Sequence, residues 1–170
     1  LIIDEFVYDP NPARRGKLAS YDGVIARANR PLLMWAGTNK VPVVNVWPSS
    51  SVHHLLPSVF HDFTLTGRII AEHLLARGLR SFATLTSGKN VADNLELKEM
   101  TRLFSEAGFT CNSRLIPQNP WESLNHWRKT EHIIESWMDE WKLPIGVYVN
   151  GESEGRMIVE ACRRRGWSVP

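Results

Sequence analysis

Tryptophans in the expected loops are the side chains best suited to bind a small ring. The chain has seven tryptophans in 170 residues. Trp47 and Trp121 fall at the carboxyl ends of expected strands or beside helix starts, where an indole face can stack on the C–H bonds of a sugar ring. Trp137 and Trp141, four residues apart on an expected helix, are typical of a buried core. For Trp47 and Trp121 the pattern leaves open both a ligand contact and a structural role.

Two carboxylates occupy similar positions between a strand and a helix. Asp62 precedes an expected helix, and Glu152 follows the expected strand at 145–149. A carboxylate at such a place can accept hydrogen bonds from ligand hydroxyls. It can equally serve the helix, because Asp caps free N–H groups and Glu favours the positive end of the helix dipole. The sequence leaves both interpretations open.

The sequence lacks the motifs of common enzymes and metal sites. The segment 87–90, Ser-Gly-Lys-Asn, has neither the earlier glycine nor the following Ser or Thr of a phosphate loop, and no nucleophile elbow occurs. His53 and His54 are adjacent and diverge, and Cys111 and Cys162 are too few for a four-cysteine zinc site. We predict a protein that is not an enzyme and has no metal or cofactor. Two free cysteines suit a reducing cytoplasm.

Composition and charge exclude several further classes of protein. Hydrophobic residues make up 43% of the chain and charged residues 22%, which excludes a disordered chain. The apolar runs are far shorter than the roughly 20 residues of a membrane span. A net charge of +2 exerts little pull on DNA, and the run 163–165 of arginines suits the negative end of a helix dipole. We predict no membrane contact and no DNA contact by this chain alone.

Short apolar runs alternate with longer helical patterns and predict an α/β fold with a parallel, doubly wound sheet. The expected strands cover 1–7, 23–26, 43–46, 59–60, 81–85, 109–116 and 145–149. The expected helices cover 64–77, 92–107, 122–141 and 152–165. Ligands bind such sheets at the carboxyl ends of the strands, in the loops 47–57, 61–63, 86–93, 117–122 and 150–154. The chain opens directly on a strand and stops soon after a helix, so we expect a piece of a longer protein.

Several segments resemble one family, in order along the chain. The stretch 59–78 joins a strand that ends at Asp62 to a helix with Gly67, the run Ala-Glu-His-Leu and a final glycine. Upstream lie 22–25 (DGVI) and 41–44 (VPVV), and downstream lie 104–108 (FSEAG) and 165–170 (RGWSVP). Together these motifs resemble the sensor domains of the lactose/galactose repressor family over nearly the whole chain. Within that family, the greatest likeness is to regulators of xylose operons, on Trp127, Trp137, Cys162 and Ser-Gly-Lys at 87–89.

The resemblance implies a two-lobed periplasmic-binding-protein-like I fold, with parallel sheets flanked by helices, that closes on a small ligand. By that likeness, residues 1–86 form part of the N-terminal lobe and 87–170 part of the C-terminal lobe, and the fold is truncated at both ends. The likeness further implies the effector-binding domain of a cytoplasmic bacterial transcription regulator, with a sugar such as the pentose xylose as effector. Operator DNA would be bound only through a helix-turn-helix outside this chain, and the likeness allows a homodimer.

The resemblance also marks residues for a ligand site. Glu152 falls where the family typically has an Asp that binds sugar hydroxyls, and Glu96 falls near a position where many members have an Arg that reaches the ligand. The predicted ligand-binding set is Trp47, Asp62, Ser87, Glu96, Trp121 and Glu152. The alternative is a periplasmic sugar-binding protein of a transport system, which shares this fold.

Overall fold

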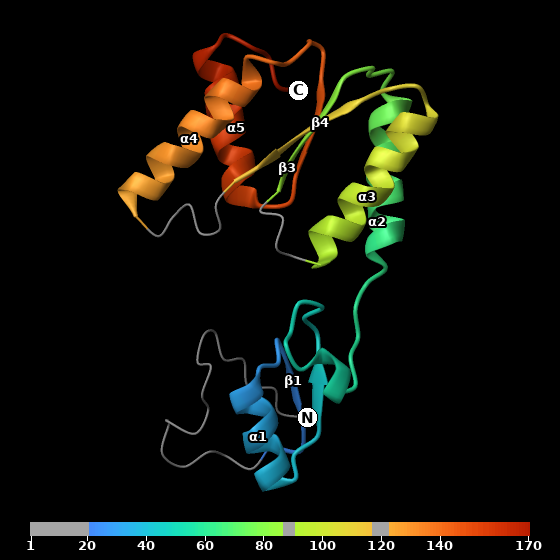
Figure 1. Ribbon diagram of the computed structural model, residues 1–170, viewed down its shortest axis with the longest axis vertical. Helices are drawn as coiled ribbons and strands as arrows, with labels where there is room; N and C mark the ends of the chain where they lie inside the picture. The colour runs from blue at the N-terminus through green and yellow to red at the C-terminus, as the bar shows by residue number, and fades with distance from the viewer. Residues whose placement is uncertain (1–20, 87–90, 117–122) are drawn as a thin grey trace. The chain divides into compact units, whose positions relative to one another are not determined.

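The computed structural model describes residues 21–86, 91–116 and 123–170 (Figure 1). The chain divides into two compact units, Leu1–His61 and Asp62–Pro170, and each unit has its own parallel sheet. The expected boundary between lobes after residue 86 stays a prediction about the complete lobes, and the expected strand at 1–7 lies outside the described residues. No helix in the described ranges is both long and apolar enough to cross a membrane.

The described residues of the first unit form a strand–helix–strand motif. Strands β1 (Val24–Ala26) and β2 (Val43–Asn45) pair in parallel, helix α1 (Arg30–Asn39) joins them, and the short 3-10 helix η2 (His53–Leu55) follows. Parallel neighbours need such a crossover, because a hairpin can join only antiparallel strands. The buried residues of this unit's apolar core are Ala28, Leu32, Ala36, Val43 and Val52.

Helix α1 is an element that the apolar pattern did not predict. Its start carries a clear local signal, since the side chain of Asn29 accepts a hydrogen bond from the Leu32 amide at 3.0 Å and Pro31 occupies the first turn. Asn at the N-cap and Pro just inside it are both favoured at helix starts. The apolar residues of α1 face several directions, with Met34 exposed, and so they give only weak helical periodicity.

The fully buried Asn45 organises the loop that leaves β2. Its Oδ1 accepts hydrogen bonds from the backbone amides of Ala28 and Trp47, both at 3.1 Å. Its Nδ2 donates to the carbonyl of Trp47 at 2.9 Å. A buried amide engaged on both sides fixes its neighbours, so the backbone at Trp47 is set by the end of β2.

The second unit confirms most of the predicted alternation of helices and strands. Its elements are α2 (Phe63–Ala76), β3 (Phe82–Thr86), α3 (Val91–Glu106), β4 (Cys111–Leu115), α4 (Leu124–Met138), β5 (Gly146–Val149) and α5 (Glu152–Arg164). Gly78 and Gly108, just past α2 and α3, have φ of 73° and 84°, a region that favours glycine. The expected strand at 59–60 is wrong: it is not a strand in the structure, and next to it Ser58 makes one isolated bridge to the end of the short strand β2.

The strand order β4-β3-β5 decides which helix covers which face of the second sheet. All three strands are parallel. The chain steps from β3 to β4 through α3, then returns across β3 to β5 through α4. Because such crossovers are right-handed, steps in opposite directions put α3 and α4 on opposite faces. Figure 1 shows α2 and α3 on one side of the sheet and α4 and α5 on the other.

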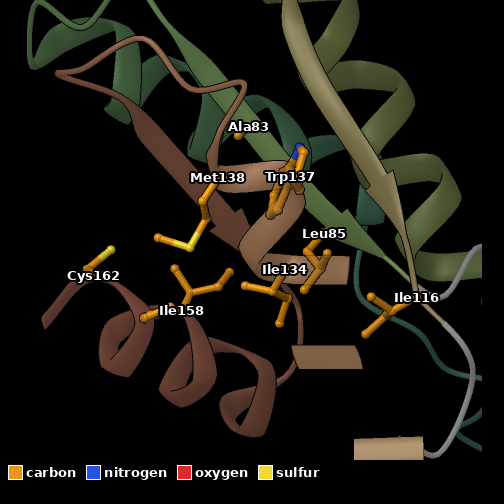
Figure 2. Packing of buried hydrophobic residues seen from close by; sticks show 9 residues of the cluster. Ala83, Leu85, Ile116, Ile134, Trp137, Met138, Ile158 and Cys162 are labelled. Atoms are coloured by element: carbon orange, nitrogen blue, oxygen red, sulfur yellow. The ribbon is translucent and has the colours of Figure 1, made fainter. Parts of the chain in front are cut away.

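Alternating residues of β3 supply the two cores of this unit. Phe82 faces α2 and α3 and stacks on Phe104, with 3.9 Å between ring centroids. Leu85 faces α4 and α5, where it packs with Trp137 and Ile158 (Figure 2). Both faces of a parallel sheet are thus covered, as near-continuous apolar strands require.

Candidate functional site

The carboxyl ends of β3 and β5 form the best-placed edge of the structure for a ligand. These two strands are neighbours in the sheet. From β3 the chain continues to α3 on one face, whereas from β5 it continues to α5 on the other face. Open α/β sheets bind their ligands at a switch point of this kind. The topology therefore directs the search to the starts of α3 and α5.

Asp93 and Asn150 meet at this switch point. Asp93 lies in the first turn of α3, and Asn150 directly follows β5. The side-chain amide of Asn150 donates a hydrogen bond to Oδ1 of Asp93. A carboxylate and an amide beside each other offer both acceptors and a donor, which is the combination that a polyhydroxylated ligand can use.

The surroundings of Asp93 are unusual for a carboxylate. Its residue surface is only 8% exposed. Burial raises the pKa of the Asp93 carboxyl above its ordinary value, the hydrogen bond from Asn150 acts in the opposite direction, and the Glu154 carboxylate raises the pKa further. A buried carboxylate whose pKa is shifted by burial and by named neighbours is a candidate for a functional site.

Glu96 lies one helical turn beyond Asp93 and is buried between α3 and the sheet. It is 4% exposed, and its Oε2 accepts a hydrogen bond of 2.8 Å from the hydroxyl of Tyr148 on β5. Helix α2 approaches closely on the other side, since a Cβ added at Gly67 would lie 2.5 Å from the carbonyl oxygen of Glu96. The predicted ligand residue Glu96 is thus enclosed by three elements and held by Tyr148.

Asp62 and Glu152, the two carboxylates that the sequence left open, both lie at helix starts. Asp62 caps α2, because its Oδ1 accepts a hydrogen bond of 2.9 Å from the Leu65 amide. Glu152 is the first residue of α5, with a side chain 79% exposed that pairs with Arg156 at 2.5 Å. The capping interpretation of Asp62 is confirmed, while a ligand contact of either carboxylate stays a prediction.

The other three predicted ligand residues divide between the first unit and the undescribed segments. Trp47 lies in the loop after β2, partly exposed, as expected from the sequence. Ser87 and Trp121 lie outside the described residues. Trp47 thus belongs to the first unit, whereas Asp93 and Asn150 belong to the second. Contact of Trp47, Ser87 or Trp121 with a ligand stays a prediction.

Asp93, Tyr148 and Asn150 are the residues that sequence reasoning missed. Asp93 closes the expected loop 86–93 and Asn150 opens the expected loop 150–154, so both loops were identified as candidate regions. The missing step was the strand order, which makes these two loops neighbours. The signal for Tyr148 is weaker, because a tyrosine inside a buried strand looks like any aromatic core residue.

Two hollows lie elsewhere in the described part of the chain. One hollow of about 380 Å³ lies between α4 and α5, where Trp127 and Met157 are rimmed by charged side chains. Another, of about 480 Å³ and largely apolar, lies between α1 and the loop after β2. Within the described ranges, no three or more His, Cys, Asp or Glu side chains gather as metal ligands.

Comparison with solved structures shows the same fold. A xylose-binding transcription activator, XylR, superposes with a TM-score of 0.67 at 18% identity over 88% of this chain and 40% of its own. A LacI family transcriptional regulator from Bifidobacterium animalis subsp. lactis has a TM-score of 0.65 at 13% identity, over 88% of this chain and 54% of that one. The periplasmic component of the arabinose ABC transporter from Shewanella sp. ANA-3 has a TM-score of 0.60 at 17% identity, over 87% and 52%.

The chain spans about half or less of the length of these solved proteins, and the likeness confirms the predicted α/β periplasmic-binding-protein-like architecture. No curated protein sequence matches the chain. The model of the family described as periplasmic binding protein-like domain matches residues 71–170, which includes both loops of the switch point. Because that match covers more than half of the sequence, this chain belongs to the family of periplasmic binding protein-like domains.

Proposed function

We propose that this chain is the effector-binding domain of a bacterial transcription regulator, and that its effector is a sugar, specifically a pentose such as xylose. The observation that carries the proposal is the meeting of Asp93 and Asn150 at the switch point of the second sheet. Membership of the family and the shared fold with a xylose-binding activator and LacI family regulators support it. On this proposal the domain binds and does not catalyse.

The chemistry of the edge suits a neutral, hydroxyl-rich molecule. Ionised Asp93 accepts hydrogen bonds from hydroxyl groups, and the amide of Asn150 can both donate and accept. Each hydrogen bond between a hydroxyl and a charged carboxylate contributes roughly 1.5–3 kcal/mol. In addition to Asp93 and Asn150, the proposed ligand residues are Trp47, Asp62, Ser87, Glu96, Trp121 and Glu152. On this proposal, the rings of Trp47 and Trp121 stack on the sugar ring.

Regulation of transcription requires parts outside these 170 residues. On this proposal, a helix-turn-helix elsewhere in the protein binds operator DNA, and the domain works in the cytoplasm, with a homodimer as the proposed assembly. The net charge of +2 agrees with a domain that does not itself attract DNA strongly.

Calorimetric titration of the chain with xylose, arabinose, ribose, glucose and galactose tests the proposal. We expect saturable binding of at least one pentose, and Asp93→Asn should weaken it by about 10- to 100-fold, since about 1.4 kcal/mol corresponds to a factor of ten. Glu152→Gln should weaken it by about tenfold if the exposed carboxylate turns to the ligand. Glu160→Gln, farther along α5, is the matched control and should bind like the wild type. Absence of binding for all five sugars, or wild-type affinity in Asp93→Asn, would contradict the proposal.

A second candidate function is a periplasmic sugar-binding protein of a transport system. The fold shared with the arabinose-transporter component from Shewanella favours it. The complete reading frame separates the two functions. A helix-turn-helix supports the regulator, and an export signal supports the transport protein.

A further inference from the structure

We propose that Tyr148 is a positioning residue for ligand binding: through Glu96 it fixes the start of α3 and so the place of Asp93 at the switch point. The inference rests on the proposed function, because it assigns a role in the same binding edge. Tyr148 itself lies in β5, inside the sheet, and acts on the ligand only through its neighbours.

Two successive hydrogen bonds join β5 to α3. The Tyr148 hydroxyl donates to Oε2 of Glu96 at 2.8 Å, and the Asn150 amide donates to Oδ1 of Asp93. Asp93 and Glu96 are three residues apart, which places them on one face of the helix. Tyr148 lies in β5, and Asn150 is the first residue after that strand. On this proposal, the hydrogen bond between Tyr148 and Glu96 supports the hydrogen bond between Asn150 and Asp93, which lies one helical turn nearer the start of α3.

Helix α2 prevents α3 from withdrawing away from these two hydrogen bonds. At Gly67 the two helices approach so closely that a Cβ would lie 2.5 Å from the Glu96 carbonyl oxygen and 2.9 Å from its Cα. Glu96 is thus fixed on one side by the backbone of α2 and on the other by the Tyr148 hydroxyl. Close-packed interiors transmit small displacements, so loss of that hydroxyl should be felt one turn away at Asp93.

The ring of Tyr148 has its own place in the core. It packs with the cluster around Phe82 and Phe104, beneath α2 and α3. Burial raises the pKa of the Tyr148 hydroxyl, and the nearby carboxylates of Glu96 and Asp93 raise it further, so the hydroxyl stays a donor at neutral pH. Tyr148→Phe keeps the packed ring and removes only that donor, which makes the hydrogen bond separable from the packing.

The experiment compares Tyr148→Phe with Thr84→Val. Thr84 is a suitable control because it is buried on the same face of the sheet, but its hydroxyl donates to Ser113 on β4 at 2.9 Å and not to α3. Nuclear magnetic resonance follows the backbone amide of Asp93 and the side-chain amide of Asn150, and calorimetry follows pentose affinity. Tyr148→Phe should shift both resonances. It should also weaken affinity by about tenfold, because a displaced Asp93 carboxylate would lose one charge-assisted hydrogen bond to the ligand. Thr84→Val should do neither.

A second pair of variants shows whether Tyr148 acts through Glu96. Glu96→Gln keeps an oxygen that accepts from Tyr148 and should leave the Asp93 and Asn150 resonances near their wild-type positions. Glu96→Ala should shift them as Tyr148→Phe does, and adding Tyr148→Phe to Glu96→Ala should change nothing more. Non-additivity of this kind identifies two residues that act as one unit.

The outcomes separate this inference from the proposed function. Unshifted resonances in Tyr148→Phe, equal shifts in Thr84→Val, or shifted resonances with unchanged pentose affinity would overturn the positioning role. If the wild type binds none of the sugars, the proposed function fails, while the resonances still decide whether Tyr148 holds Asp93 in place.

Discussion

On the α4 and α5 side of the second sheet the buried side chains are apolar apart from Thr130, and the charged groups lie at the rim. On the α2 and α3 side, by contrast, carboxylates are buried within the packing. Arg164 and Arg165 pair with Glu135 at the rim of the α4 and α5 side, at 2.5 and 2.9 Å. Among the described residues, the buried carboxylates of the other side belong to α3: Asp93, Glu96 and Glu99.

The difference separates stability from function in one small unit. A buried carboxylate is unfavourable unless it is hydrogen-bonded, and each of the three on α3 has a partner: Asn150, Tyr148 and Arg102. Ion pairs at an exposed rim contribute only about 0–1 kcal/mol each. We therefore expect the α4 and α5 side to carry most of the folding free energy, and the α2 and α3 side to hold the groups that meet a ligand.

The largest effect should come from the apolar side. Trp137 is fully buried, its Nε1 donates to Oδ1 of Asn112 at 3.0 Å, and its ring meets that of Trp141 edge-on at 4.9 Å. Trp137→Ala should lower the free energy of unfolding by about 3–5 kcal/mol, measured by urea denaturation. Trp127→Ala, at a partly exposed position on the same helix, should cost about 1 kcal/mol. Equal losses in the two variants would show that burial of the Trp137 ring in the α4 and α5 core adds nothing to the free energy of unfolding.

A smaller effect should follow from crowding the α2 and α3 side. Gly67→Ala would place a methyl group against the backbone of Glu96. It should lower the free energy of unfolding by about 1–3 kcal/mol, because overpacking forces the helices apart. Gly37→Ala in α1 is the matched control, since nothing lies within 4 Å of the new Cβ. It should stabilise by up to about 1 kcal/mol, as Ala favours a helix over Gly. Thermal melts of both variants test this prediction. A Gly67→Ala protein as stable as the Gly37→Ala control would disprove the close approach of α2 to α3 at Gly67.

The smallest expected effect is a pH dependence that distinguishes the two sides. Hydrogen bonds from Arg102, aided by Arg68, lower the pKa of Glu99 from its usual 4.5 to about 2. A lowered folded-state pKa stabilises the protein above pH 4.5, and this contribution is lost as the pH falls from 4.5 through about 2. Glu99→Gln should therefore be less stable than the wild type at neutral pH, and the gap should close toward pH 2.

Glu140 provides the comparison on the α4 and α5 side. A hydrogen bond from Asn112, with Arg114, also lowers the pKa of Glu140, but its side chain is 51% exposed against 10% for Glu99. Solvent screens the exposed pair, so Glu140→Gln should show a smaller gap at neutral pH. Denaturation midpoints between pH 2 and pH 7 measure the stability difference of each variant from the wild type. A larger difference for Glu140→Gln than for Glu99→Gln would contradict the expectation that the more buried carboxylate contributes more.

Local patterns in the sequence determined most elements of the second unit. The apolar periodicity and the glycines at 78, 108 and 166 predicted α2, α3 and α5, and compact β-branched runs predicted β3 and β5. These features depend on contacts between residues close in the chain, which a sequence displays directly. Helix α1 was not predicted, because its signal lies in the capping residue Asn29 and in Pro31 rather than in apolar periodicity. The predicted strand at 59–60 was wrong, because a short apolar run does not show whether a neighbouring strand is there to pair with it.

Only the tertiary structure decided where the candidate site lies. The loops 86–93 and 150–154 are far apart in sequence, and no periodicity shows that β3 and β5 are neighbours. The strand order β4-β3-β5 brings Asp93 to Asn150, and the right-handed crossovers put α3 and α4 on opposite faces of the sheet, where α5 packs with α4. The same packing turned Glu96 inward to Tyr148 and left Glu152 exposed. Burial and long-range pairing depend on the whole fold, so residue type and local spacing identify a carboxylate but not its neighbours.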